Sequence, residues 1–571
     1  MKKVSGSPLP LGVTYKNGRA NFAMEVPEGK TCKLLLYRKG EASLLASYVF
    51  SDRIGSVYYM AVDGLKEEAY EYNYDIDGEC VTDSYAKALS GKEIWLKNIG
   101  ISGKSKEHVR GIFYEDHYDW EADQSPRIKE EERIAYAIHV RGFTKDTHSK
   151  VKNKGTFQGV IEKIPYLKDL GINQIQCMPV YEFEEAGMRV NYWGYGPGYY
   201  FAPKSAYAKD GDGVKGLKDL VKCCHKAGIE VVLEMPFSEG VSGLMVTDCL
   251  RNYVMEYHVD GFILNPYNVP MDIILKDPIL SGVRILRHAE EFQNVMRRFL
   301  KGDEGVVTDV MYQTRKRWDL EGIYNCITTH TGFTLKDLVS YDGKHNEANG
   351  ENNQDGPDYN YSWNCGAEGL TRKKAVLELR KNQMRNAMFL LLLSQGVPCI
   401  LAGDEFANSQ KGNNNVYCQD NPIGWLNWRN LLKEQEMYQF VKQLIKFRKK
   451  YRLFHQEKEL LGIDQSGCGM PDVSYHGEMA WRAPTEVASR QIGIYYSSQN
   501  KEEADCFVAY NMHWLEHEFA LPALKKGRKW YRAASTKEGI LKDLVVLENQ
   551  RNIELDEREI VVLVSGKGET V

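Results

Sequence analysis

Hydrophobic and polar residues alternate along the first part of the chain. The runs ANFAMEV, CKLLLYRK, SVYYMAV and YEYNYDI have the period of two that is typical of half-buried β-strands, and Gly, Asp and Lys residues separate them. The pattern predicts a small β-sandwich over residues 1–95. A polar and charged stretch follows over residues 96–130 and ends in QSPRIKEEER, which is typical of a linker.

From Arg133 the pattern changes to apolar runs separated by amphipathic segments. The runs IAYAIHV, INQIQCMPV, IEVVLEMPF and DGFILNP are nearly continuous in apolar residues, as in parallel strands covered by helices. Several such units over residues 131–454 predict an α/β fold, a closed (β/α)8 TIM barrel rather than an open sheet. Alternation returns in DCFVAYNMHW and REIVVLVS, and predicts a second β-sandwich over residues 455–571.

Composition limits the kind of partner. A formal net charge of −4 gives no reason to expect nucleic acid or an anionic membrane. No apolar run is long enough to cross a membrane, and no signal-peptide pattern is present. The 12 cysteines are scattered without the spacing of a zinc site. We therefore expect a cytoplasmic protein with no metal and no cofactor. The 35 Tyr and 10 Trp residues suit a sugar-binding surface, although a large core also accounts for most of them.

Several long stretches are distinctive: GTFQGVIEKIPYLKDLGINQIQCMPV, NYWGYGPGYYFAPKSAYA, HTGFTLKDLVSYDGKHNEANGENNQDG and LLLLSQGVPCILAGDEFANSQKGNNNVYCQDNPIGWLNW. They resemble glycoside hydrolase family 13, in particular its glycogen-debranching and isoamylase-like members. The N-terminal stretch PLPLGVTYKNGRANFAMEV resembles the carbohydrate-binding module of those members. The resemblance implies a barrel with its catalytic groups at the carboxyl ends of the strands, and α-glucan as the substrate class.

The catalytic carboxylates of this family are missing from their expected positions. A retaining glycosidase needs a nucleophilic carboxylate and a second carboxyl group as general acid, and family members use a third carboxylate to hold the sugar. The resemblance places Asn265 at the nucleophile, Ile263 at the preceding arginine and Thr331 at the third carboxylate. On the third strand, Glu234 replaces the family aspartate. A neutral amide such as that of Asn265 cannot act as the anionic nucleophile.

The general acid also has no convincing candidate. The family fits a strand ending in Glu between the nucleophile and FLKGDEG, but Glu290 and Glu291 fall in a segment with a helical pattern. Glu234 and Glu239 offer a new pair of carboxylates as an alternative, with a lower expectation. The sequence therefore predicts that the whole catalytic centre is degenerate.

Sugar-contacting positions are better preserved. The resemblance assigns stacking on the sugar to Tyr195 and hydroxyl binding to His330, and Trp193 and Asn265 complete the candidate substrate-binding set. Each position also has a structural explanation, because Tyr195 and Trp193 would pack the barrel mouth and His330 has lost its carboxylate partner.

Three functional hypotheses follow. The first is a pseudoenzyme that binds α-glucan (glycogen or starch-derived maltodextrin), binds a protein partner, or self-associates. The second is an active debranching hydrolase that cleaves α-1,6 bonds of glycogen or amylopectin with relocated acids. The third is a scaffold with a closed barrel mouth, which Ile263, Pro236 and Met235 would fill.

Overall fold

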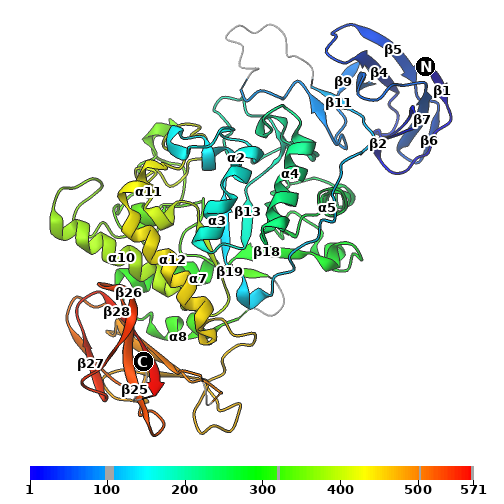
Figure 1. Cartoon of the computed structure of the whole chain (residues 1–571). Helices are drawn as coiled ribbons and strands as arrows, with labels where there is room; N and C mark the ends of the chain where they lie inside the picture. The colour runs from blue at the N-terminus through cyan, green and yellow to red at the C-terminus, as the bar shows by residue number, and fades with distance from the viewer. Residues whose placement is uncertain (97–108, 318–321, 501–502, 568–571) are drawn as a thin grey trace.

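The computed structural model describes residues 1–96, 109–317, 322–500 and 503–567. Three parts follow one another along the molecule: an N-terminal sandwich, a central barrel surrounded by helices, and a C-terminal sandwich at the opposite end (Figure 1). Residues 97–108 of the expected linker lie outside the described residues.

Two antiparallel sheets form the N-terminal sandwich. The first contains β1 (Lys2–Val4), β2 (Gly12–Lys16), β3 (Arg19–Glu25), β6 (Asp52–Ile54) and β7 (Val57–Asp63). The second contains β4 (Cys32–Arg38), β5 (Leu44–Val49), β8 (Tyr70–Ile76), β9 (Glu79–Val81), β10 (Leu89–Ser90) and β11 (Arg110–Ile112). Alternate residues such as Phe22, Leu34 and Tyr72 bury their side chains between the sheets. Because Gly111 of β11 pairs with Tyr72, the second sheet continues beyond the boundary expected at residue 95.

Parallel strands close into the central barrel. They are β12 (Ala135–Ile138), β13 (Gln174–Cys177), β16 (Glu230–Glu234), β17 (Gly261–Ile263), β18 (Arg284–His288), β19 (Ile323–Asn325) and β20 (Val397–Leu401). The closed parallel barrel is confirmed, but the described residues supply seven strands where we predicted eight. The described residues between β18 and β19 form α7 (Glu290–Lys301) and α8 (Val307–Arg315) with no strand between them, and Arg287 of β18 pairs directly with Ile323 of β19.

Helices cover the outside of the barrel (Figure 1). They are α1 (Val140–Thr144), α2 (Phe157–Glu162), α3 (Ile164–Leu170), α4 (Gly213–Lys226), α5 (Gly243–Tyr257), α6 (Met271–Ile274), α9 (Leu335–Leu338), α10 (Lys374–Leu392), α11 (Arg429–Lys433) and α12 (Gln435–Lys450). After β13, the strands β14 (Tyr181–Phe183) and β15 (Gly198–Pro203) form a separate antiparallel pair. Within the described ranges, none of the helices has the length and apolar character needed to cross a bilayer.

The C-terminal sandwich has a large and a small sheet. The large sheet contains β21 (Val473–His476), β22 (Gln491–Tyr496), β23 (Cys506–Asn511), β25 (Arg528–Ser535), β26 (Gly539–Val546) and β28 (Glu559–Lys567). The small sheet pairs β24 (His517–Ala520) with β27 (Asn552–Leu555). One face of the large sheet packs on the small sheet, and Phe507 lies in that interface. The opposite face, with Val508, joins the hydrophobic core of the barrel.

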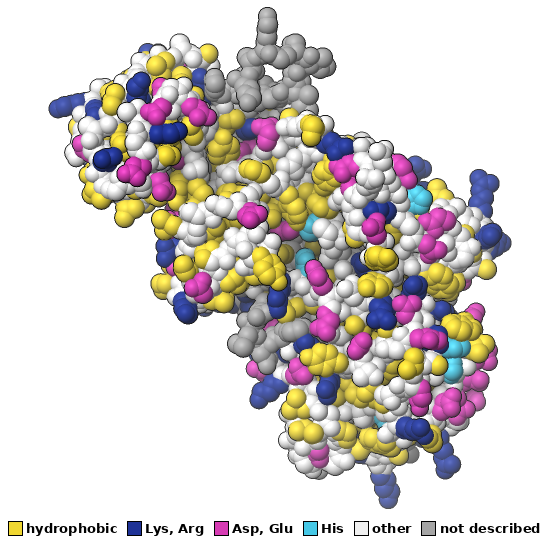
Figure 2. Space-filling view, turned by 180° about the vertical axis from the view of Figure 1, so that it is seen from behind, with side chains coloured by type: hydrophobic (Ala, Val, Ile, Leu, Met, Phe, Trp, Pro, Cys, Tyr) yellow, Lys and Arg dark blue, Asp and Glu magenta, His cyan; other side chains and the backbone are white. Residues whose placement is uncertain are grey.

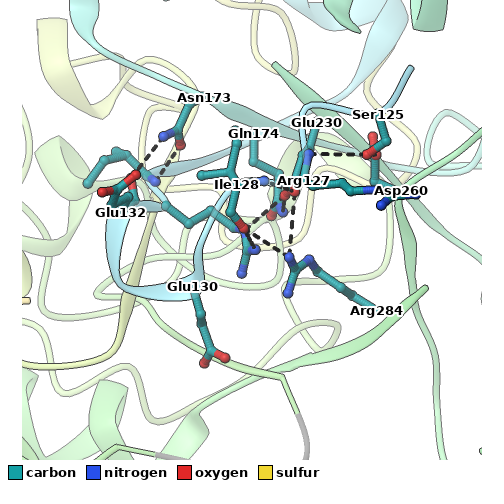
Figure 3. Close-up of polar contacts among 12 residues, drawn as sticks. Ser125, Arg127, Ile128, Glu130, Glu132, Asn173, Gln174, Glu230, Asp260 and Arg284 are labelled. Atoms are coloured by element: carbon teal, nitrogen blue, oxygen red, sulfur yellow. Dashed lines mark hydrogen bonds and ion pairs between the residues drawn. The ribbon is translucent and has the colours of Figure 1, made fainter. Parts of the chain in front are cut away.

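Buried ion pairs fix the amino end of the barrel. Glu230, at the start of β16, accepts a hydrogen bond of 2.8 Å from Arg133 Nε, and both side chains are 1% exposed. The Ile128 N–H and the Gln174 amide also donate to Glu230, at 2.9 and 2.8 Å, and Arg284 Nη2 donates to the Ile128 carbonyl at 2.9 Å (Figure 3). These contacts hold the C-terminal part of residues 116–133, which we call the strap, against the amino ends of the strands.

Candidate functional site: the carboxyl end of the barrel

A small cavity lies at the carboxyl end of the barrel strands, where barrel active sites are built. Successive strand ends contribute Ile138, Gln176, Glu234, Ile263 and His288 to its lining. Its volume is about 60 Å³, whereas pockets for organic ligands typically measure roughly 300–1,000 Å³. Histidine side chains lie in a hollow near the middle of the molecular surface (Figure 2). The cavity has room for a few water molecules and is too small for a sugar ring.

Glu234 ends β16 and points into this cavity. The Tyr195 hydroxyl donates a hydrogen bond to Glu234 and lies 2.6 Å from Nε2 of His330. Burial raises the pKa of Glu234, against the lowering effect of the Tyr195 hydrogen bond. Burial lowers the pKa of His330 to about 4, so its imidazole is neutral and Nε2–H donates to the Tyr195 oxygen. The three residues form one hydrogen-bonded chain across the mouth.

His288 is a cavity residue that the sequence analysis missed. It ends β18, and its Nε2 lies 3.3 Å from Oε1 of Gln176. Burial lowers the pKa of His288 to about 4, which leaves it uncharged. This strand occupies the interval in which the family resemblance implied a strand ending in Glu. Glu290 and Glu291 begin α7, as the helical pattern predicted, and do not line the cavity.

His139 was also missed, and its contacts identify a structural role. Its Nδ1 accepts a hydrogen bond of 3.0 Å from the Gly142 N–H and so caps α1, while Nε2–H donates to the Tyr192 carbonyl at 2.8 Å. Burial lowers the pKa of His139 to about 4. Both nitrogens are therefore occupied by backbone partners, and the ring is fixed as a neutral tautomer.

The predicted site residues fall into two groups. Glu234, Ile263, Trp193 and His330 line the cavity, and Tyr195 is hydrogen-bonded to two of them; Asn265 and Thr331 are exposed and lie outside it. The Asn265 side chain accepts a hydrogen bond of 3.1 Å from the Tyr267 N–H within its own turn. Thr331 Oγ1 lies 3.2 Å from Thr329 Oγ1.

Glu234 contributes the single carboxyl group among the described residues that line the cavity. Two other acids of the mouth region are buried in structural contacts: Asp404 accepts from the Leu335 N–H at 2.8 Å, and Glu405 accepts from the Tyr136 hydroxyl at 2.6 Å. Glu239 is exposed on the loop after β16. Within the described chain, no group of three or more His, Cys, Asp or Glu residues is arranged to hold a metal ion.

Only one of the three residues expected to fill the barrel mouth of a scaffold lines the cavity. Of Ile263, Pro236 and Met235, Ile263 lines the cavity, whereas Met235 is buried in the core outside it and Pro236 is only partly buried. Trp193 and the neutral imidazoles of His139, His288 and His330 also line the cavity. The Trp193 ring packs edge-on against His330, with 5.0 Å between the ring centroids.

An open trough of about 490 Å³ lies beside the cavity. Its lining combines aromatic and polar side chains: Trp193, Tyr195, Tyr417, Arg189, Asn191, Asn415, Glu351 and Asp355. Arg189 and the Tyr417 hydroxyl both donate to Glu351, which fixes one wall of the trough. Since Tyr195 lines the trough and is bonded to Glu234 and His330 of the cavity, it separates the two spaces.

A parallel barrel between two β-sandwiches is the architecture of solved pullulanase-type proteins. The catalytic module of the multi-modular glycogen-degrading pneumococcal virulence factor SpuA superposes with a TM-score of 0.77 at 16% identity, covering 98% of each chain. Pullulanase from Paenibacillus barengoltzii, in complex with maltohexaose and α-cyclodextrin, gives a TM-score of 0.75 at 17% identity, covering 98% of this chain and 95% of that one. At these identities the likeness establishes the fold alone.

Sequence comparison establishes the family. Residues 138–238 match the model of the α-amylase catalytic domain. The chain is 30% identical to the glycogen operon protein GlgX homolog of Haemophilus influenzae, covering 78% of this chain and 84% of the relative. It is 28% identical to the chloroplastic isoamylase SU1 of Zea mays, covering 93% and 84%. The chain belongs to the α-amylase family, glycoside hydrolase family 13, among its isoamylase and GlgX-like members.

Proposed function

We propose that this protein is a non-catalytic member of its family, which binds α-glucan without cleaving it. The observation that carries the proposal is the cavity of about 60 Å³ with Glu234 as its single carboxyl group among the described residues. Retaining glycosidases place two carboxyl groups about 5–5.5 Å apart on either side of the sugar. A space this small excludes the sugar ring, and one carboxyl group cannot act as both nucleophile and acid. The cytoplasmic location stays a prediction.

The trough is the proposed position of the glucan. Tyr417 and Tyr195 offer partly exposed aromatic surfaces beside the buried Trp193, and Arg189 and Asn191 offer hydrogen-bond donors for sugar hydroxyls. By analogy with other aromatic contacts, stacking contributes about 1 kcal/mol per ring. Binding in the trough would leave the glycosidic bonds outside the cavity. Binding of a protein partner at the same mouth is the second form of the hypothesis.

Affinity electrophoresis through gels that contain glycogen tests binding, and an assay of linear chains released from amylopectin tests cleavage. We expect retarded migration and no released chains. Tyr417→Ala should reduce the retardation, and Tyr312→Ala, which removes a partly exposed tyrosine of α8, is the matched control. Released chains would favour the hydrolase hypothesis with relocated acids. Absence of both retardation and cleavage would favour a scaffold or a protein partner.

A further inference from the structure

The strap is fastened between α4 and α5 at the amino end of the barrel. Lys222 of α4 donates to the Asp119 carbonyl at 2.9 Å, and the Trp120 ring stacks on the imidazole of His258, with centroids 3.9 Å apart. Asp123 follows, and its side chain is only 3% exposed. This carboxylate enters a closed group of charged side chains contributed by the strap, α4 and the turn before β17.

His225 of α4 lies between two buried carboxylates. Its Nδ1 is 3.1 Å from each Asp123 oxygen, and its Nε2 is 3.0 Å from Oδ2 of Asp260. The side chains are 1–3% exposed. An ionised carboxylate can only accept hydrogen bonds, so both ring nitrogens must carry protons. With both carboxylates ionised, the geometry fits an imidazolium cation at His225.

The two carboxylates have further donors. Asp260 accepts from the Val231 N–H at 2.6 Å and from the Ser125 hydroxyl of the strap. Asp123 also accepts from Nδ1–H of His258 at 2.8 Å. Asp260 therefore stays fixed to the barrel by β16, whereas Asp123 is held to it through imidazole rings.

We infer that His225 is a proton-operated latch, which holds the strap against the barrel while protonated and releases it when it loses a proton. A neutral imidazole has one N–H, so either Asp123 or Asp260 would face an unprotonated nitrogen in a buried place. The loss falls on the Asp123 contact, because Asp260 keeps the Val231 N–H of β16 as a donor. The opening is local, since the N-terminal sandwich keeps other contacts with the barrel, including the ion pair of Lys92 with Glu184 at 2.6 Å.

The charges around His225 favour its protonated form, and so favour release of the strap at high pH rather than at low pH. Burial lowers the pKa of His225, but the hydrogen bond and charge of Asp260, and then those of Asp123, outweigh it and leave the pKa raised. Other titratable groups nearby are His258, which shares Asp123, and the solvent-facing pair of Lys222 with Glu121 at 3.2 Å. Because the pKa of His225 is raised in the folded state, its stabilisation of the strap is complete below the unfolded-state pKa of about 6.5. That stabilisation is lost as the pH rises through the folded-state pKa.

Hydrogen exchange of the full-length chain, read by mass spectrometry on peptides from residues 116–128, tests the latch between pH 6.5 and 9.5. Rates are corrected for the intrinsic pH dependence of exchange and referred to peptides of β28. We expect local opening in the wild type to increase up to tenfold per pH unit above the pKa of His225. His225→Gln should open the strap at every pH, because glutamine cannot donate to both carboxylates.

Asp123→Asn is the matched control. Its amide can donate to Nδ1 of a neutral His225, accept from His258, and leave Nε2–H of His225 to donate to Asp260. Protection of the strap should then be independent of pH. Equal pH dependence in the wild type and Asp123→Asn, or full protection in His225→Gln, would overturn the inference. An NMR titration of the His225 Cε1 signal, assigned by its loss in His225→Gln, gives a second test: a midpoint at or below about 6.5 contradicts the latch.

Discussion

At the amino end of the barrel, Glu230 is paired with Arg133 and His225 lies between two carboxylates, whereas at the carboxyl end Glu234 shares its cavity with three imidazoles that burial keeps neutral. No lysine or arginine of the described chain lines that cavity. Glycosidase chemistry needs charge at the carboxyl end, and stability needs charge to be matched wherever it is buried. In this molecule the buried charges described at the amino end are matched, whereas the cavity at the carboxyl end holds one carboxyl group among neutral imidazoles.

The largest expected effect is at the amino end. Glu230→Gln should lower the free energy of unfolding by about 3–5 kcal/mol, because it leaves Arg133 as a buried charge without a counterion. The Ile128 N–H points at one Glu230 oxygen, and Arg133 and Gln174 point at the other, so an amide NH2 faces a donor in either orientation. Guanidinium unfolding measures the change.

Glu378→Gln is the control for that substitution. The Glu378 side chain is 66% exposed and lies 4.0 Å from Lys381, so its loss should change the free energy of unfolding by less than about 0.5 kcal/mol. Similar effects at Glu230 and Glu378 would contradict the view that the amino end is held by matched buried charge.

Glu234→Gln, the equivalent substitution at the barrel mouth, should raise the free energy of unfolding rather than lower it. Because burial raises the pKa of Glu234 in the folded state, the wild type loses stability as pH rises from the unfolded value through the folded one. Glu234→Gln removes that loss, and its amide oxygen can still accept from Tyr195. At pH 7 we expect the variant to be more stable by about 1 kcal/mol.

The pH dependence separates this explanation from a simple packing effect. The advantage of Glu234→Gln should disappear below the unfolded pKa of about 4.3, where the wild-type carboxyl group is protonated in both states. Thermal unfolding of the two proteins from pH 3 to pH 8 measures it. An advantage that is constant over this range, or a destabilised variant at pH 7, would show that Glu234 is a matched charge after all.

The local pattern of apolar and polar residues correctly predicted strands whose burial follows directly from that pattern. Continuous apolar runs such as that around Val231 identified barrel strands, and alternation around Phe22 identified the first sandwich. The strand β18 was missed because Arg284 and Arg287 interrupt its apolar run; Arg284 turns to the polar amino end of the barrel, and Arg287 is exposed on the outside. The sequence pattern also did not reveal that the described residues form seven barrel strands; between β18 and β19 these residues form α7 and α8.

Long-range geometry accounts for the other differences. The family resemblance assigned Asn265 to the nucleophile position, but its exposure depends on β17 ending at Ile263 and the chain turning outward before Pro266. The group formed by Asp123, His225 and Asp260 joins residues that are 102 and 35 positions apart, so no motif identifies it. Residues that depend on the closed barrel can be assigned only once the strands are placed.

The trough should show an effect similar in size to that of Glu234→Gln and smaller than that of Glu230→Gln. Tyr417→Ala removes one aromatic wall and the hydroxyl bonded to Glu351, and should weaken maltooligosaccharide binding by about 1 kcal/mol, roughly fivefold in Kd. Isothermal titration calorimetry with maltohexaose measures it. Glu234→Gln should leave this affinity unchanged, because the cavity is too small for the sugar; a large loss in that variant would mean that glucan enters the cavity.

The smallest expected effect is at Asn265, the position that the family resemblance assigns to the nucleophile. Asn265→Asp places a carboxylate at that position. That carboxylate would be exposed outside the cavity, in a turn where it can accept from the Tyr267 N–H as asparagine does. We expect stability within about 0.5 kcal/mol of the wild type and no release of linear chains from amylopectin. Activity gained from this single change would require a general acid already in place and a barrel mouth that opens to admit the sugar. It would then contradict the view that the carboxyl end of the barrel is not catalytic.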